Sequence, residues 1–267
     1  MLSEQEGVSM FSYEVALDYW EIFLLILVRI ASFVNTAPFF NMSNTPQRTK
    51  LGLSFFISMI IFTLIPEREV VYDGVIGYAA LVIKESIAGL LLGFVCNVCV
   101  QTITFAGHLI DFEIGLSMAS MYDPTLNEQV SVSGSLYHRS VFLLLMVSGM
   151  YQFLISAIVD SYGIIPVGEL TVNSSLYGSV LGIVTEYVLI GFRIALPIFV
   201  TSMILNAILG ILTKVAPQMN MFAVGIQIKL LVGLAIMFLT VSLLPSISSY
   251  IMNMMKQVIK SVAGGLI

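Results

Sequence analysis

The chain has 267 residues, of which 58% are hydrophobic and 10% are charged. A soluble globular protein carries roughly 25% charged residues because its surface must be solvated, so this composition excludes an ordinary soluble domain. The net charge is −5 and the eleven Lys and Arg residues are scattered, which argues against a nucleic-acid-binding protein.

Six apolar runs predict helices that are embedded in a membrane. A helix needs about 20 mainly apolar residues to cross the hydrocarbon core. The runs that meet or approach this length cover residues 22–40, 51–65, 75–105, 140–159, 176–212 and 222–244. A seventh, amphipathic segment covers residues 246–262. No basic residue precedes Arg29, unlike in a secretory signal, so we expect the first run to be retained.

The lengths of these runs are uneven. Residues 51–65 are short for a span, whereas residues 176–212 would form about 55 Å of helix. Arg193 and Pro197 lie inside this longest run, so we expect a kink or a break there. Six independent crossings also give no consistent orientation by the positive-inside rule. The lengths therefore favour helices that pack among partner helices.

No catalytic motif is found in the sequence, so we expect a protein that is not an enzyme and has no cofactor. His108 and His138 lie in different segments, without the cluster of ligands that a metal site requires. Cys96 and Cys99 form a CxxC inside an apolar run. A redox or metal role would need a second pair or an electropositive setting, so we favour two buried packing residues.

Two pairs of glycines have the GxxxG spacing that is typical of close helix packing in membranes. Gly89 and Gly93 form the first pair, and Gly178 and Gly182 form the second. Small residues four positions apart leave a groove into which another helix can fit. The spacing does not identify the helix that fills the groove, and chance is the alternative in a glycine-rich chain.

Six ionisable residues interrupt the apolar runs, and each costs about 2.5–3.5 kcal/mol on insertion scales. Such residues normally face protein or water, either in a proton relay or in pairs between helices or subunits. The chain of carboxylates expected of a pump is missing, so we favour pairing. The six are Arg29, Lys84, Glu85, Glu186, Arg193 and Lys229.

The segment at residues 105–122 mixes glycines, charges, small residues and methionines. Two interpretations remain open. Irregular backbone can line a cavity at membrane depth, where Met118 and Met121 would give a deformable seal. Alternatively, the segment is a cytoplasmic loop with an amphipathic helix.

Short motifs follow one another in order along nearly the whole chain. They are Arg29 to Pro38, Pro46-Gln47-Arg48, Lys84-Glu85 leading into Gly89 to Phe94, Gly107, Asp111, Gly115, Leu116, Asp123-Pro124, Ala216 to Phe222, Gly225 and Lys229. Each motif is weak alone. Their order, their spacing and the total length resemble the FliR family of flagellar export proteins and the equivalent subunit of type III secretion injectisomes.

The resemblance implies an all-α membrane protein of about six long apolar helices, bent or hairpin-like, that are built for a helical multi-subunit pore. One such chain would join FliP-like and FliQ-like subunits, beside FlhB- and FlhA-like export-gate proteins, in the bacterial inner membrane at the flagellar basal body. The pore would pass unfolded flagellar proteins. Residues 1–165 would form a FliP-like part, and residues 166–267 would form a FliQ-like hairpin part with the amphipathic C-terminal segment.

The resemblance also implies a plug loop at about Gly107 to Asp123 that lies inside the pore and helps to close it. Family members often have phenylalanines in its later half, where this chain has Met118, Met121 and Tyr122. The implied plug residues are Gly107, Asp111, Phe112, Gly115, Leu116, Met118, Met121, Tyr122, Asp123 and Pro124. A tight hairpin turn that faces the FlhB-like protein would contain Ala216, Pro217, Asn220 and Phe222.

Two alternatives accompany this interpretation. The first is the equivalent subunit of a virulence injectisome. The second is a self-contained secondary transporter, which usually has broken helices in two matching halves. Arg193 and Pro197 offer one such helix, but no matching half is evident.

Overall fold

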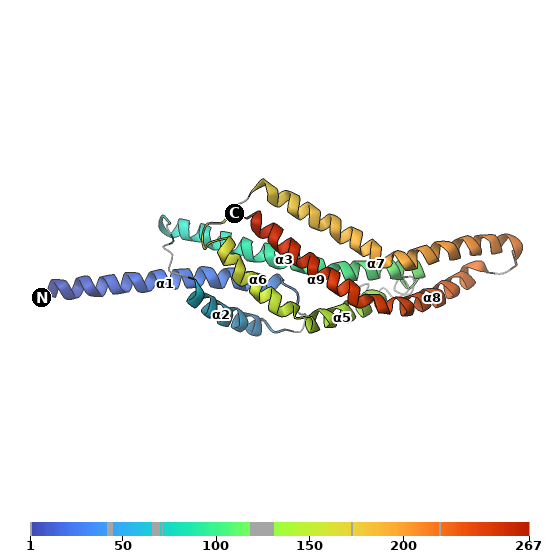
Figure 1. The fold of residues 1–267 in the computed structure, drawn as a ribbon, viewed down its shortest axis with the longest axis horizontal. Coiled ribbons are helices and arrows are strands. Elements are labelled where there is room, and N and C mark those ends of the chain that lie inside the picture. Colours follow the sequence, from blue (N-terminus) through green and yellow to red (C-terminus); the bar gives the residue numbers. More distant parts are fainter. Residues whose placement is uncertain are drawn as a thin grey trace. The chain divides into compact units, whose positions relative to one another are not determined.

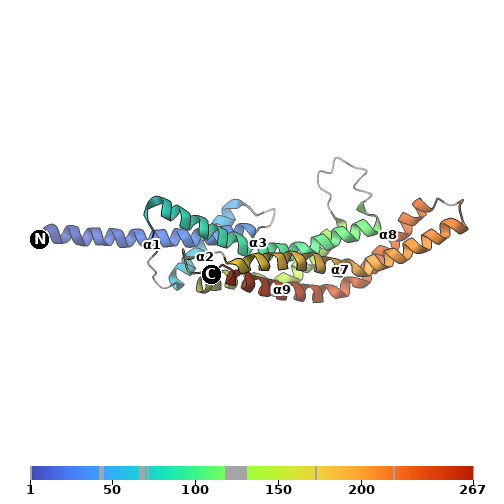
Figure 2. The ribbon, with the colours of Figure 1, turned by 90° about the horizontal axis from the view of Figure 1, so that it is seen from above.

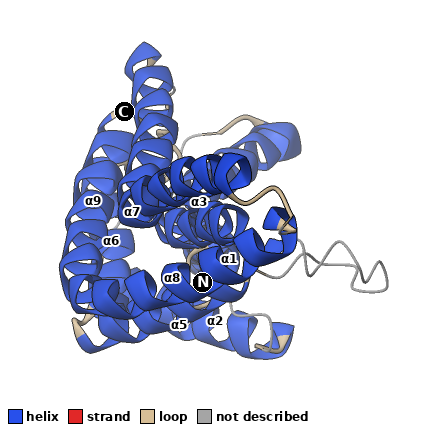
Figure 3. Ribbon diagram, turned by 90° about the vertical axis from the view of Figure 1, so that its right-hand side faces the viewer, coloured by secondary structure: helices blue, strands red, loops and turns tan. Residues whose placement is uncertain are grey.

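The computed structural model describes residues 2–41, 45–65, 70, 72–117, 131–171, 173–218 and 220–266. These residues form helices, turns and loops, with no strand among them (Figure 3). In chain order the helices are α1 Leu2–Thr36, α2 Gln47–Leu64, α3 Gly74–Ile114, α5 Val132–Val147, α6 Met150–Ile164, α7 Ser174–Val215, α8 Met221–Thr240, the 3₁₀ turn η1 Val241–Leu243, and α9 Leu244–Gly264.

The helices gather into two compact units. The first unit contains residues 1–97, 151–181 and 256–267, and the second contains residues 98–150 and 182–255. In the first unit α1 and α2 lie side by side (Figures 1 and 2). In the second unit the later part of α7 and α8 form a hairpin (Figures 1 and 2).

The apolar runs form helices. Part of the apolar surface of each helix is buried in the core of the chain, and the rest faces lipid or partner proteins. Four of the described helical stretches are long and apolar enough to span a membrane, and the bent pair α5 and α6 can add a fifth. In the apolar windows of α7 and of Ala223–Gly264, only 17% of residues are buried inside the chain. An apolar surface this exposed requires lipid or protein around it. The chain is an all-α membrane protein, as the composition predicted.

Helix α3 shows why one predicted boundary was wrong. The third run was expected to end at residue 105, but the helix continues to Ile114. Its buried side continues at helical spacing through Cys99, Ile103, Ala106 and Ile110. This stripe keeps the backbone helical through a polar stretch that resembles a loop in the sequence.

One further sequence prediction needs correction. Residues 140–159, predicted as one run, belong to α5 and α6, which are separated at Ser148 and Gly149. Gly149 has φ +78°, a conformation that glycine adopts without steric cost. The kink or break expected near Arg193 and Pro197 is not a break, because α7 runs through Pro197 as one helix, and Figure 1 shows that this helix bends where its colour turns from gold to orange.

Candidate functional site

The first unit contains an ion pair between α1 and α3. Nε of Arg29 donates to Oε2 of Glu85 at 2.5 Å, and Nη2 donates to Oε1 at 3.0 Å. Both side chains are 0% exposed, and no other ion pair joins described residues of the chain. Two fork-shaped bonds to one carboxylate give the strong, oriented geometry that arginine supports and lysine does not.

The same two side chains also hold the segment that connects α6 to α7. Nη1 of Arg29 donates to the carbonyl of Ile165 at 2.9 Å, and Nη2 donates to that of Pro166 at 3.4 Å. The backbone N–H of Gly168 donates to Oε1 of Glu85 at 2.8 Å. The Arg29 guanidinium also lies 4.2 Å from the centre of a tyrosine ring, that of Tyr162. The buried pair therefore joins three segments that are far apart in the sequence.

Two glycines of α3 continue this interface along α1. A Cβ atom at Gly89 would overlap the Arg29 carbonyl, and one at Gly93 would overlap the Thr36 hydroxyl. The groove of this GxxxG is thus occupied by α1 of the same chain. At Gly178 and Gly182 an added Cβ would meet nothing within 4 Å, so the second pair packs against no described residue.

The second unit contains a polar anchor around Asp111, which lies on the last turns of α3 and is 4% exposed. Its Oδ2 accepts a bond from the Ser131 hydroxyl at 2.7 Å, and its Oδ1 accepts the Ser133 N–H at 3.2 Å. Ser131 is also the N-cap of α5, because its Oγ accepts the N–H of Gly134 at 2.8 Å. One carboxylate therefore connects the end of α3 to the start of α5.

Close backbone packing strengthens this anchor. A Cβ atom at Gly107 would overlap the backbone of Gly134, and one at Gly134 would lie 2.6 Å from the Ser131 hydroxyl. Ser133 turns its own hydroxyl to the sulfur of Met237 on α8, at 3.3 Å. The start of the predicted plug segment is thus fixed to α5, and α5 is fixed in turn to α8.

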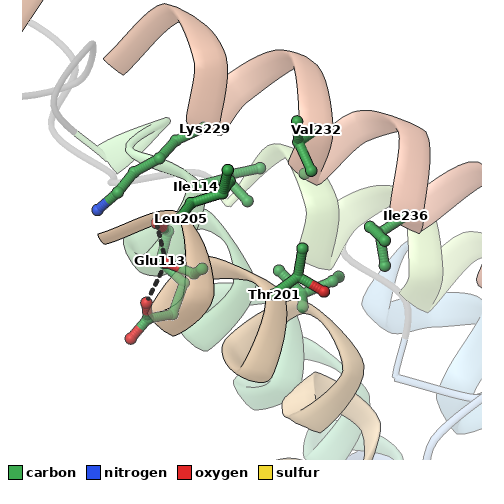
Figure 4. A pocket seen from close by; sticks show the side chains of 10 residues that line it. Glu113, Ile114, Thr201, Leu205, Lys229, Val232 and Ile236 are labelled. Carbon is green, nitrogen blue, oxygen red and sulfur yellow. Dashed lines mark hydrogen bonds between the residues drawn. The ribbon is translucent and has the colours of Figure 1, made fainter. Parts of the chain in front are cut away.

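A small cavity beside the anchor is formed by α3, α7 and α8 (Figure 4). Glu113 lies at one end of it, where Oε2 accepts the Ser202 hydroxyl at 2.9 Å. Lys229 enters at the same end from α8, outside ion-pair distance of Glu113. Gly233 makes room for α3, because an added Cβ there would overlap Ile114. The volume of about 10 Å³ holds no more than one water molecule.

Only some of the other predicted plug residues lie in the described part of the chain. Phe112 lies on α3 and is 75% exposed. Gly115 follows the helix with φ +87°, and Leu116 is half-buried. Met118, Met121, Tyr122, Asp123 and Pro124 lie outside the described residues.

The predicted hairpin turn lies between α7 and α8. Ala216 and Pro217 follow the last residue of α7, and Asn220 caps α8 through a bond from the N–H of Ala223 at 3.4 Å. Phe222 belongs to the first turn of α8. Of the remaining predicted charges, Lys84 is half-buried, while Glu186 and Arg193 are exposed on α7.

Nothing in the described part of the chain forms a metal site, since no three His, Cys, Asp or Glu residues gather there. His138 stacks on the ring of Phe142, with the ring centres 5.7 Å apart. Cys96 and Cys99 are both buried.

Sequence reasoning missed the residues that complete both polar clusters. Tyr162 gives no local signal, because it pairs with Arg29 across more than a hundred residues. Ser131 and Ser133 do give one, since a serine directly before an apolar helix is a common N-cap. The start of α5 was not predicted, because the polar stretch around Asp111 was interpreted as a loop.

Known proteins resemble this chain over most of its length. The family model described as "Bacterial export proteins, family 1" matches residues 20–255. The flagellar biosynthetic protein FliR of Escherichia coli is 27% identical over 249 residues, covering 92% of this chain and 93% of that protein. FliR of Bacillus subtilis is 27% identical over 85% of this chain and 89% of that protein. For FliR of Aquifex aeolicus the identity is 29%, over 83% and 85%.

The family match covers both polar clusters described above, from Arg29 on α1 to Met237 on α8. The resemblance inferred from the motifs is confirmed. The chain belongs to the bacterial export proteins of family 1, together with the flagellar biosynthetic proteins named FliR.

Proposed function

We propose that this chain is a core subunit of the flagellar protein-export channel and acts with FliP-like and FliQ-like subunits to pass unfolded flagellar proteins across the bacterial inner membrane. The observation that carries the proposal is the end-to-end similarity to proteins named flagellar biosynthetic protein FliR, which reaches 93% of the Escherichia coli protein. The FlhB- and FlhA-like proteins would be its neighbours in the export gate.

The exposed apolar surface supports a role inside an assembly. Large side chains such as Met203 on α7, at 58% exposure, and Leu231 on α8, at 70%, are left mostly uncovered by the described residues. Partner helices would cover such side chains in a multi-subunit pore. In this proposal residues 1–165 supply a FliP-like part, and residues 166–267 supply a FliQ-like hairpin with its turn at residues 216–220.

We further propose that the segment from Gly107 to Asp123 helps to close the channel. The support is that the segment begins on a fixed base: Asp111 accepts bonds from Ser131 and Ser133, and Gly107 packs on Gly134. A fixed base would let the residues beyond it be presented at one place in the pore. No reaction is assigned to the chain, and the driving energy would come from other components.

The test is deletion of the gene from its own bacterium, followed by measurement of flagellin in the medium and of swimming. Loss of both, with recovery on re-expression, is expected. A tagged copy should also retain FliP-like and FliQ-like proteins through purification. Normal flagellin export in the deletion strain would overturn the proposal. Normal swimming with loss of injected effector proteins would instead identify an injectisome subunit, and transport by the purified chain alone would identify a self-contained transporter.

A further inference from the structure

The second unit contains a cavity of about 290 Å³ that neither polar cluster uses. It lies around η1, which connects α8 to α9, and its walls come from α5, α7, the last residue of α8, η1 and α9. Arg193 and Tyr250 bring polar groups to it, and Ile194, Leu244 and Ile247 give apolar surface. This volume is just below the roughly 300 Å³ at which ligand pockets begin.

Arg193 is the one charged residue among those that line this cavity. It is exposed, and within the described residues it makes no ion pair. The nearest carboxylate along α7 belongs to Glu186, two helical turns away, whereas residues three or four apart are the ones that meet on a helix. The planar guanidinium presents five donors that match a phosphate or a carboxylate. The guanidinium at this cavity can therefore bind an anion.

The position of Arg193 along α7 indicates where that anion lies. Residues 194–213 carry no charge, and Lys214 follows them. These 20 residues form about 30 Å of helix, which is the thickness of a hydrocarbon core. If they cross the core, Arg193 lies at one membrane surface and Lys214 at the other. Phosphate groups of lipids lie at that level.

The other polar groups of the cavity fit the same level. The buried Tyr137 hydroxyl already shares a hydrogen bond with that of Thr240, at 3.0 Å. Ser246 and the half-exposed Tyr250 also line the cavity, and their hydroxyls bond to no other described residue. Tyrosine is enriched at membrane surfaces because its ring is apolar and its hydroxyl is wet. These two hydroxyls have no hydrogen-bond partner among the described residues. Together with the guanidinium of Arg193 they form a set of donors for an anion with several oxygens.

We propose that this cavity binds the phosphate of a membrane phospholipid, held by Arg193 with Ser246 and Tyr250 as further donors, while the acyl chains start along the apolar lining of the cavity at Ile194, Leu244 and Ile247. A carboxylate on a partner helix would also neutralise the charge of Arg193, but the paired hydrogen bonds from the guanidinium would be enough to bind it. The two extra hydroxyls and the level of Arg193 along the helix favour the lipid. This inference does not depend on the proposed export role.

The test measures lipid retention by the full chain, purified with any subunits that accompany it, in native mass spectra after detergent removal. Phosphatidylglycerol is the probe, and diacylglycerol, which lacks the phosphate, is the matched control lipid. Wild-type protein should retain phosphatidylglycerol in preference to diacylglycerol. Arg193→Gln should weaken that retention about tenfold, because a bond to a charged group is lost. Lys214→Gln is the control variant, since it removes a cation outside the cavity.

Two milder variants guard against misfolding of Arg193→Gln. Tyr250→Phe and Ser246→Ala remove only the hydroxyls, and each should weaken retention a few-fold at an unchanged elution volume. Equal loss in Arg193→Gln and Lys214→Gln would show nonspecific lipid and overturn the proposal. Equal retention of diacylglycerol would exclude the phosphate. Unchanged lipid retention in Arg193→Gln together with loss of a co-purifying subunit would identify a partner carboxylate instead.

Discussion

Arg29 and Glu85 form a doubly hydrogen-bonded ion pair in which neither side chain is exposed to solvent. Taking two charges out of water is costly, and the cost is offset only when both partners and their hydrogen bonds are present. Because Arg29 also bonds to two carbonyls and Glu85 to an N–H, each charge is fixed to its own side of the pair.

We therefore expect Arg29→Gln or Glu85→Gln to destabilise the chain by roughly 3–5 kcal/mol. The exchanged variant, Arg29→Glu with Glu85→Arg, should not recover this loss, because a glutamate at position 29 would face carbonyl oxygens. Thermal unfolding of the purified protein in detergent measures the effect, with Lys84→Gln as the control. Full recovery in the exchanged variant would show that only charge balance matters there.

The glycines of α3 give a second prediction, in which substitution by alanine destabilises the chain at these positions but not at a control position. Gly89→Ala and Gly93→Ala should destabilise the chain by about 1–3 kcal/mol through overpacking against α1. Gly178→Ala is the control, because an added methyl there meets nothing within 4 Å. Alanine favours helix over glycine by about 1 kcal/mol, so the control should be neutral or stabilising. Equal losses in unfolding temperature at all three positions would contradict the assigned contacts.

The contact between Gly191 and Phe105 permits a rescue experiment. The ring of Phe105 stacks on Tyr187, with centres 5.0 Å apart, and lies where a Cβ of residue 191 would be. Gly191→Ala should cost about 1–3 kcal/mol. The smaller residue in Phe105→Leu should return at least half of that cost in the double variant, as measured by a double-mutant cycle of unfolding temperatures. Strict additivity of the two changes would mean that the ring and the glycine do not compete for space.

Asp111 gives a prediction about closure of the proposed channel. Asp111→Ala leaves the Ser131 hydroxyl and the Ser133 N–H without their acceptor, at a cost of about 1–3 kcal/mol. If the segment beyond Asp111 helps to close the pore, the variant should leak ions through membranes that contain the assembled complex. Single-channel conductance measures the leak, with Gln101→Ala, at an exposed position of α3 outside the proposed plug segment, as the control. If the pore stays closed in Asp111→Ala at normal complex yield, the hydrogen bonds of Asp111 are not required for closure.

Deletion of residues 118–123 tests the segment without removing its base. The complex should assemble at its usual yield, because Gly107, Asp111 and Ser131 remain, and its membranes should become leaky to ions. The conductance of the deletion variant is compared with that of the wild type. An unchanged conductance would refute the role assigned to these residues.

The sequence predicted the helices well where apolar runs were uninterrupted, as for α2 and α8. It failed at α3, where Asp111 and Glu113 resemble loop residues because their partners Ser131 and Ser202 are distant in sequence. Arg29 and Glu85 were both recognised as costly charges, yet nothing local pairs residues that are 56 positions apart. The position of a polar residue in a run is thus readable from sequence, whereas its partner depends on tertiary packing.

The anchor at Asp111 also bears on how this part of the chain can evolve. The bond from Ser131 to Asp111 joins two points that are 20 residues apart in the chain, and the entropy of closing such a span rises by only about 0.6 kcal/mol for each doubling of its length. Insertions, deletions and exchanges of phenylalanine for methionine within it therefore cost the fold little. In the proposed export role, selection could therefore change the size of the side chains in that stretch to suit the exported proteins, while the helices on either side keep their sequence.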